Sequence, residues 1–204
     1  MLIEHQGKGP TIHESAWVAP NAIVSGDVTI GPHARVLYGA VLTAESGSIT
    51  IGAHSLVMEQ AVVRATKRFP TRIGDHVLIG PHAHLSGCNV EDDVFIATGS
   101  SIFNGATLER AATVRINGIV HINSRLPQGV DMPIGWIAVG DPAQILSPDQ
   151  WDAIGPALRN EDFSKTVFGL DASDSRSNVM KAMTTSYAEV LGRHRDDVIL
   201  NAGG

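Results

Sequence analysis

The residue best suited to chemistry in this sequence is Arg64, because the planar guanidinium of an arginine forms paired hydrogen bonds with a carboxylate or a phosphate. A regular spacing, described below, predicts that several other side chains share one surface with it: Thr43, Ser86, Phe103 and His121. A positive charge among polar side chains on one surface could bind a small anionic substrate.

Groups that can transfer protons border this surface. Glu45, Glu59 and His84 are candidate acid–base residues, and Met58 stands beside Glu59. A carboxylate or an imidazole can act as a general acid or base when it reaches the reacting atom. The same residues allow a second interpretation, in which Arg64 only forms an ion pair with Glu45 or Glu59 and the site is inactive. From the sequence, both interpretations stay open.

A period of six residues positions these side chains. In the stretch 71–90, the aliphatic residues Ile73, Ile79 and Leu85 lie six residues apart. This spacing fits neither the 3.6-residue period of a helix nor the two-residue alternation of a plain strand. It is the hexapeptide repeat of a parallel β-helix, in which each hexad supplies one short strand and a turn.

The repeat extends in both directions through most of the chain. It begins at Ile12, reaches Val120 and is interrupted by a longer insertion at 65–72. At three hexads per turn, about eighteen hexads predict a triangular coil of about six turns. Beyond Val120 the pattern weakens. The sequence therefore predicts a β-helix domain at 1–145 and a helical appendage at 146–200.

The appendage contains two helix signals. Ser147 and Pro148 mark a first helix, with serine as the N-cap and proline at the first helical position. A second, amphipathic segment runs from about 178 to 193. We expect its apolar side to lie against the coil or a neighbouring subunit.

Composition limits the classes of partner and location. Hydrophobic residues make up 43% of the chain but aromatic residues only 5%, which suits a narrow aliphatic core. A net charge of −6 argues against nucleic acid as a partner. The single cysteine, Cys88, favours a reducing compartment. Because neither a signal peptide nor an apolar run of about 20 residues is evident, we expect a soluble cytoplasmic protein without a membrane partner.

Residues 10–160 resemble the gamma-class carbonic anhydrase family of left-handed β-helix proteins. The resemblance rests on the hexads, on the stretch IGDHVLIGPHAHLSGC and on VGDPAQIL, which is similar to the family's G-x-P-A-K ending. It implies a left-handed coil and a homotrimer. It also implies a zinc or iron ion between subunits, held by three histidines, that activates a water molecule to attack carbon dioxide.

The family's metal positions carry other residues in this chain. Its three histidines fall on Arg64, Pro81 and Ser86, and neither an arginine nor a proline offers a lone pair to a metal. The family's arginine, its aspartate and its Gln-Asp pair fall on Thr43, Glu45, Met58 and Glu59.

A metal site of another kind would need other ligands. His82 and His84 lie close together in the central hexads, but no third ligand is evident. The sequence therefore predicts surface histidines at these positions, no metal site and no cofactor.

These observations predict a gamma carbonic anhydrase-like homotrimer that has lost its metal and binds a small anionic substrate at the cleft between subunits. As an enzyme it would be a metal-independent lyase or hydrolase rather than a carbonic anhydrase. Its acid–base groups would be Glu45, Glu59 and His84. Its substrate-binding residues would be Arg64, Thr43, Ser86, Met58 and His121.

Two alternatives remain. The first is an acyltransferase that uses acyl-coenzyme A, with His84 or His121 as general base. The basic residues of the insertion, Lys67, Arg68 and Arg72, would then contact the phosphates of the coenzyme. The second is a non-catalytic subunit of an assembly, for which an ion-paired and empty cleft would be the sign.

Overall fold

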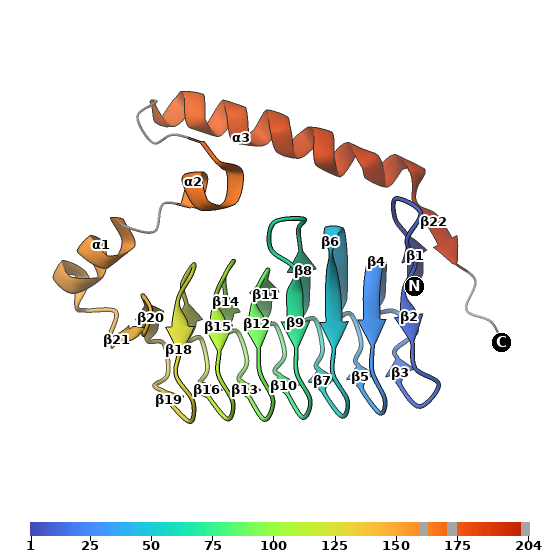
Figure 1. The fold of residues 1–204 in the computed structure, drawn as a ribbon, viewed down its shortest axis with the longest axis horizontal. Coiled ribbons are helices and arrows are strands. Elements are labelled where there is room, and N and C mark those ends of the chain that lie inside the picture. Colours follow the sequence, from blue (N-terminus) through green and yellow to red (C-terminus); the bar gives the residue numbers. More distant parts are fainter. Residues whose placement is uncertain (160–162, 171–174, 201–204) are drawn as a thin grey trace.

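The chain folds into a stack of coils with three flat faces, and corresponding strands of successive coils run parallel (Figure 1). The computed structural model describes residues 1–159, 163–170 and 175–200. The expected fold class, a left-handed parallel β-helix with C-terminal helices, is confirmed.

Each face of the coil has its own ladder of strands. Eight strands stack on the first face: β1 (Leu2–Glu4), β4 (Ile23–Ile30), β6 (Val41–Ile51), β8 (Val62–Ala65), β11 (His84–Ser86), β14 (Ser101–Ile102), β17 (Ile119–Val120) and β20 (Ile137–Val139). Seven stack on the second: β3 (Trp17–Val18), β5 (Arg35–Val36), β7 (Leu56–Val57), β10 (Leu78–Ile79), β13 (Phe95–Ile96), β16 (Thr113–Val114) and β19 (Asp131–Met132). The third face holds the far halves of β4 and β6 together with β2 (Thr11–Ile12), β9 (Thr71–Ile73), β12 (Asn89–Val90), β15 (Thr107–Leu108) and β18 (Arg125–Leu126).

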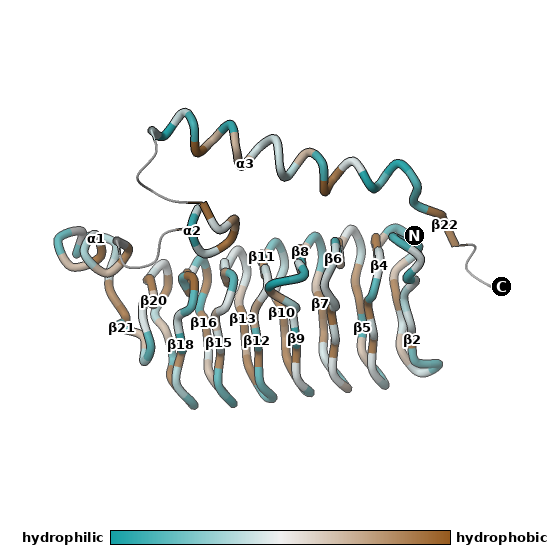
Figure 2. The backbone as a smooth tube through the Cα atoms, turned by 45° about the horizontal axis from the view of Figure 1, so that its top comes forward, coloured by the Kyte–Doolittle hydropathy of each residue, from teal (hydrophilic) through white to brown (hydrophobic). Residues whose placement is uncertain are grey.

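The six-residue period places one large and one small apolar residue of each hexad inside the coil. Leu42 and Leu85, at large positions, and Ala40 and Ala83, at small positions, are fully buried. Hydrophobic stretches therefore recur at the same place in successive coils (Figure 2). Close stacking also requires glycine at the turns, since a Cβ added at Gly52 would collide with the backbone of the next coil.

The coil is longer than the sequence predicted, with about eight turns instead of six. Leu126, Met132 and Ala138 continue the period after Val120, and all three are fully buried. Prolines that directly follow two of them weaken the pattern in the sequence. Both prolines directly follow the last strands of their ladders, β18 and β19, where a backbone N–H has no further strand of that ladder to bond.

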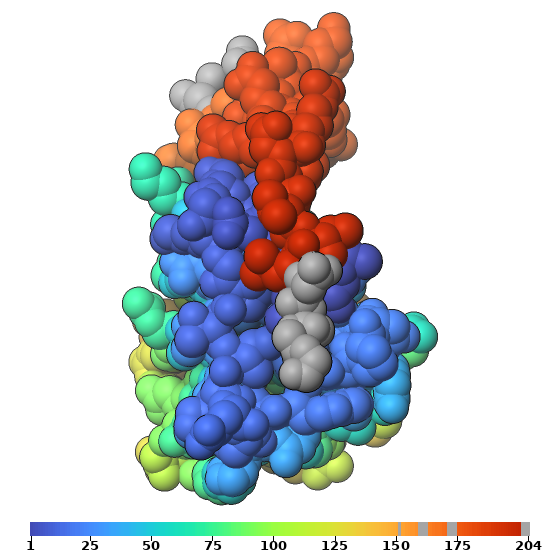
Figure 3. Space-filling model, turned by 90° about the vertical axis from the view of Figure 1, so that its right-hand side faces the viewer, coloured from blue at the N-terminus to red at the C-terminus, as the bar shows by residue number. Residues whose placement is uncertain are grey.

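The segment after the coil returns along its whole length. Strand β21 (Gln144–Leu146) pairs antiparallel with β20 and is followed by α1 (Trp151–Arg159), α2 (Phe163–Phe168), α3 (Arg176–Leu191), the 3-10 helix η1 (Gly192–Asp196) and β22 (Val198–Leu200). Helix α3 runs back over the coil to its N-terminal end (Figure 1). There β22 pairs antiparallel with β1, so the first and last strands that the structure describes lie side by side (Figure 3).

Both expected helices form, with shifted ends. The first begins at Trp151, because residues 147–150 form a turn in which the side chain of Gln150 accepts a hydrogen bond from the N–H of Ser147 (2.9 Å). The second, α3, begins at Arg176 and is capped by Ser175. None of its residues is buried, but half-buried ones recur every three or four positions, so one side faces the coil. Among the described residues, no helix is long and apolar enough to cross a membrane.

Candidate functional site

A cavity of about 390 Å³ lies between the first face of the coil and the C-terminal helices. Its floor consists of Glu45, Arg64, His84, Ser86, Phe103 and Asn104. Its roof consists of Phe163, Val167 and Phe168 from α2 and Ser186, Tyr187 and Val190 from α3. The tight turn at 66–69 and Ser46 close one side. The cavity therefore combines a polar, charged floor with a largely apolar roof.

Strand register brings Arg64 to this cavity. It pairs with Thr43 of the preceding coil and with Ser86 of the following coil, so the three side chains leave the first face in one column. Further along, the ring centre of Phe103 lies 6.2 Å from that of His121. The column that the period predicted around Arg64 is therefore confirmed.

Four of the predicted site residues, Glu45, Arg64, His84 and Ser86, line the cavity. Four others, Thr43, Met58, Glu59 and His121, are not among its described lining residues. Met58 instead lines a groove on the second face of the coil. Met58 and Glu59 follow the strand of the second face, so a corner of the coil separates them from Arg64. Within one chain, Glu59 therefore does not share the cavity with His84.

Arg64 connects the coil to α3. Its Nη2 lies 3.5 Å from Oε1 of Glu45 and donates a hydrogen bond to the hydroxyl of Tyr187. Its guanidinium also lies 5.8 Å from the ring centre of Tyr187. The side chain of Glu45 is only 4% exposed, whereas that of Arg64 is 32% exposed. The ion pair between Arg64 and Glu45 is thus present, and Arg64 still faces the cavity.

His84 is a neutral group beside this positive charge. Burial, and then the positive charge of Arg64, lower the pKa of His84 below the ordinary 6.5. The imidazole is therefore uncharged at neutral pH and has a lone pair that can accept a proton.

We expect NMR titration to place the pKa of His84 below 6.5, and the pKa to rise in Arg64→Ala because that variant lacks the repelling charge. Since the pKa is lower in the folded chain than in the unfolded one, the stabilising effect of neutral His84 is complete above pH 6.5 and is lost as the pH falls below it. Arg72→Ala is the control, because Arg72 lies on the third face. An unchanged His84 titration in Arg64→Ala would contradict this account.

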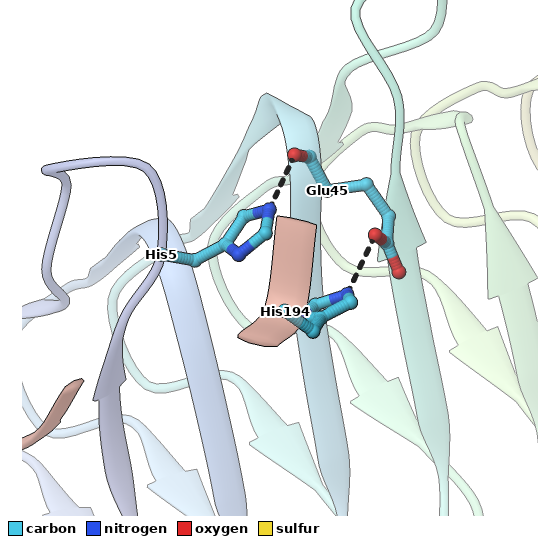
Figure 4. Close-up of side chains that lie close together, drawn as sticks. All are labelled: His5, Glu45 and His194. Atoms are coloured by element: carbon cyan, nitrogen blue, oxygen red, sulfur yellow. Dashed lines mark hydrogen bonds and ion pairs between the residues drawn. The ribbon is translucent and has the colours of Figure 1, made fainter. Parts of the chain in front are cut away.

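A second polar cluster joins Glu45 to both ends of the chain (Figure 4). Nδ1 of His5 and Nδ1 of His194 lie 2.5 and 2.8 Å from the two carboxylate oxygens of Asp197. Nε2 of His5 lies 3.0 Å from the backbone oxygen of Glu45, and Nε2 of His194 lies 2.9 Å from its Oε2. The two imidazole rings stack with their centres 4.3 Å apart.

The charges of this cluster shift two pKa values. Burial opposes ionisation of Asp197, but hydrogen bonds from His194 and His5 outweigh it and lower the pKa of the carboxyl. Burial also opposes protonation of His194, but its hydrogen bonds to Asp197 and Glu45 outweigh that effect and raise its pKa. The sequence did not predict this cluster, because it joins three distant parts of the chain, at His5, at Glu45 and at 194–197, that form no motif.

Comparison with known proteins agrees with the fold. Residues 9–44 match the family described as bacterial transferase hexapeptide (six repeats). The chain is 34% identical over 145 residues to gamma carbonic anhydrase 1, mitochondrial, of Arabidopsis thaliana, which covers 68% of this chain and 50% of that protein. It is 35% identical over 128 residues to gamma carbonic anhydrase 2, mitochondrial, of the same plant, which covers 60% and 46%. The chain thus spans about half the length of the curated relatives it matches.

Among solved structures, a hexapeptide transferase family protein from Anaplasma phagocytophilum superposes with a TM-score of 0.53 at 21% identity. The match covers 96% of this chain and 97% of that one. At this level of identity the likeness shows the fold alone.

The three positions that the resemblance assigns to metal ligands do not fit a metal ion. Arg64 and Ser86 line the cavity, whereas Pro81 lines the groove on the second face. An arginine and a proline side chain have no lone pair to donate. The part of the chain that the structure describes offers a different set of ligand atoms, in His5, Glu45 and His194.

Proposed function

We propose that this chain, a gamma carbonic anhydrase-like hexapeptide-repeat protein, binds a small anionic substrate beside Arg64 and acts on it without a metal at the family's metal positions. The charge of the cavity carries this proposal. Three cations, Arg64, Lys67 and Arg68, line it against one carboxylate, Glu45, which is a formal surplus of two positive charges (three minus one). The whole chain has a net charge of −6, so the local charge of the cavity is opposite in sign to that of the whole chain, and it favours an anion.

The residues of the floor have separate roles in this proposal. Arg64 binds the anionic group, and its contacts with Glu45 and Tyr187 hold the guanidinium in place. Neutral His84 transfers the proton, and Ser86 offers a hydroxyl beside Arg64. Glu45 orients Arg64, because its two carboxylate oxygens are engaged by Arg64 and His194.

The roof indicates what the rest of the substrate is like. Phe168, Val167 and Val190 face the cavity from α2 and α3, and Phe103 adds an aromatic ring to the floor. Apolar walls with a few placed polar groups are typical of sites for organic ligands. The proposed substrate is therefore an organic acid or phosphate ester with an apolar body.

Calorimetric titration of the full chain with small aliphatic and aromatic carboxylates, phosphate esters and acyl-coenzyme A tests this proposal. We expect binding of at least one acid at one molecule per chain. If none of these ligands binds to the folded protein, the ion pair between Arg64 and Glu45 fills an inactive site, and the non-catalytic assembly subunit becomes the better interpretation.

One observation favours the acyltransferase alternative. Lys67 and Arg68 are exposed on the turn that closes the side of the cavity, where they could contact the phosphates of coenzyme A. Arg72, the third basic residue of the insertion, lies on the third face and does not join them. If acyl-coenzyme A is the ligand, Lys67→Ala should weaken its binding but leave the binding of a free carboxylate unchanged.

We also propose a cytoplasmic homotrimer, which would bring the first face of one chain near the second face of another. Support comes from the split between Arg64 on the first face and Pro81 on the second, because positions that form one site in the family can meet here only between chains. Phe95 and Ile116, both more than 40% exposed, line the groove beside Pro81.

Light scattering at micromolar concentration should give about three times the mass of the 21.6 kDa chain. Burial of the exposed apolar side chains of the second face would drive this association. The mass of a single chain under these conditions would contradict the trimer.

A further inference from the structure

Two histidines from opposite ends of the chain point the same ring nitrogen at Glu45. His5 follows β1 and His194 lies in η1, yet both donate through Nδ1 to the carboxylate of Asp197. Their Nε2 atoms lie 3.0 and 2.9 Å from two oxygens of Glu45, the backbone carbonyl and Oε2 (Figure 4). One carboxylate therefore sets the orientation of both rings.

This arrangement gives the two Nε2 atoms different partners. A neutral imidazole that carries its proton on Nδ1 has a lone pair on Nε2. The lone pair of His194 then faces Oε2 of Glu45, which is also an acceptor, whereas the Nε2 of His5 lies 2.8 Å from the side-chain amide nitrogen of Gln6, which can donate to it. A divalent cation among these atoms would give the lone pair of His194 a partner and would take the place of the Gln6 amide beside His5.

We propose that His5, Glu45 and His194 bind one divalent transition-metal ion, and zinc fits the donors best. Imidazole nitrogen and carboxylate oxygen bind zinc at about 2.0–2.2 Å. The ligand atoms of the three residues lie within 4.8 Å of one another, so small movements of the side chains bring them onto one ion. This ion would lie away from the positions of the family's metal and revises the expectation of a chain without metal.

The surroundings of the cluster match those of a zinc site. Histidines that bind a metal commonly donate their other N–H to a carboxylate, which is the role of Asp197 towards both rings. A small cavity of about 90 Å³, lined in part by His5, Gln6 and Glu45, adjoins the cluster and offers room for a water ligand. His5 and Glu45 are buried and His194 is half-buried, so the ion would be shielded from bulk solvent.

The ion would fasten both ends of the chain to the coil. Its ligands come from the turn after β1, from β6 and from η1, which directly follows α3. The remaining carboxylate oxygen of Glu45, Oε1, would stay available to Arg64. Metal binding would thus hold the roof of the cavity in place, and it can be tested whether or not the cavity binds an anion.

The test is to remove metal from the full-length protein with a chelator and to titrate it with zinc chloride in a calorimeter. We expect one tightly bound zinc ion per chain and a higher melting temperature with zinc. His194→Asn removes a ligand and should abolish both effects. Asp197→Asn keeps all three ligands but loses the orienting carboxylate, and it should weaken zinc binding by about 10- to 100-fold.

His54→Ala is the matched control. His33, His54 and His76 form an exposed stack on the coil, with ring centres 4.8 and 5.0 Å apart, where zinc could also bind. The His54→Ala variant should still bind one zinc ion as tightly as the wild type. The proposal is overturned if the folded wild type binds no zinc, if His54→Ala loses the ion, or if folded His194→Asn binds it as tightly as the wild type. The cluster would then be a network of ion pairs only.

A variant that fails to fold does not leave the question open, because cobalt can replace zinc in the wild type. Cobalt bound through two imidazoles and a carboxylate gives visible absorption bands that distinguish it from hydrated cobalt. We expect these bands to appear with one equivalent of cobalt and to disappear when zinc is added. Their absence in the folded wild type would overturn the proposal.

Discussion

Arg64→Ala is expected to abolish anion binding while the coil keeps its fold. Loss of one partner from a buried, charge-assisted contact costs about 2–5 kcal/mol, which corresponds to a loss of affinity of about 30-fold or more. Arg64 follows inward-pointing Val63 and leaves the coil on its outer side, so its removal opens no hole in the core. Buried Glu45 loses a cation but keeps its contact with His194, and we expect a cost in stability of about 1–3 kcal/mol.

Calorimetric titration of the wild type, Arg64→Ala and Arg72→Ala with the same carboxylates measures this effect. Arg72→Ala is the matched control, since it removes an exposed arginine of the third face and changes the net charge equally. Equal affinity in the wild type and Arg64→Ala would remove Arg64 from the site. If Arg64 forms only a structural ion pair, the wild type binds no ligand and Glu45→Ala shows a similar loss of stability.

Leu85→Ala is expected to cause a large loss of stability. Leu85 is fully buried at the middle of the first face, and it pairs with Val63 and Ile102 of the neighbouring coils. Removing most of a buried leucine side chain costs about 2–5 kcal/mol, and most where the surroundings cannot collapse. Backbone pairing with β8 on one side and β14 on the other fixes the spacing of the strands here, so the hole left by the leucine side chain cannot close.

Denaturant-induced unfolding of Leu85→Ala and of Met180→Ala measures this loss. Met180 is 57% exposed on α3, and its replacement should change the free energy of unfolding by no more than about 0.5 kcal/mol. Because Leu85 lies between His84 and Ser86, folded Leu85→Ala should also bind the anion less well. A loss of stability below about 1 kcal/mol would show that this inward position is not tightly packed.

The sequence by itself determined the coil and the direction of its side chains. Each hexad is a local unit, so its aliphatic residue indicates which neighbours point inward and which point outward. This sufficed to predict that Arg64 and Ser86 share an outer column. The period did not predict the last turns, where Pro127 and Pro133 follow the inward residues and are tolerated because β18 and β19 are the last strands of their ladders.

The same period could also have separated Glu59 from Arg64, because Glu59 belongs to the hexad of the second face. From the sequence, Glu59 was expected to border the column around Arg64. In the structure Glu59 follows β7 of the second face, so a corner of the coil separates it from Arg64 on β8. A residue that borders the column in the sequence therefore need not line the same cavity as Arg64. Which of the acid–base candidates can meet in one site depends on the face, and His84 and Glu45 remain on the first.

Only the tertiary structure decided what covers the first face. The segment that contains α3 has no sequence repeat, so no spacing in the sequence predicts that Tyr187 contacts Arg64. Nor does any spacing predict that His194 contacts Glu45, which lies 149 residues earlier in the chain. The physical reason is the difference between the two parts of the chain. The coil repeats one local rule, whereas the contacts of the returning segment depend on where α3 begins, how far it runs and how β22 pairs with β1. The roof of the cavity and the histidine cluster therefore exist only in the folded chain.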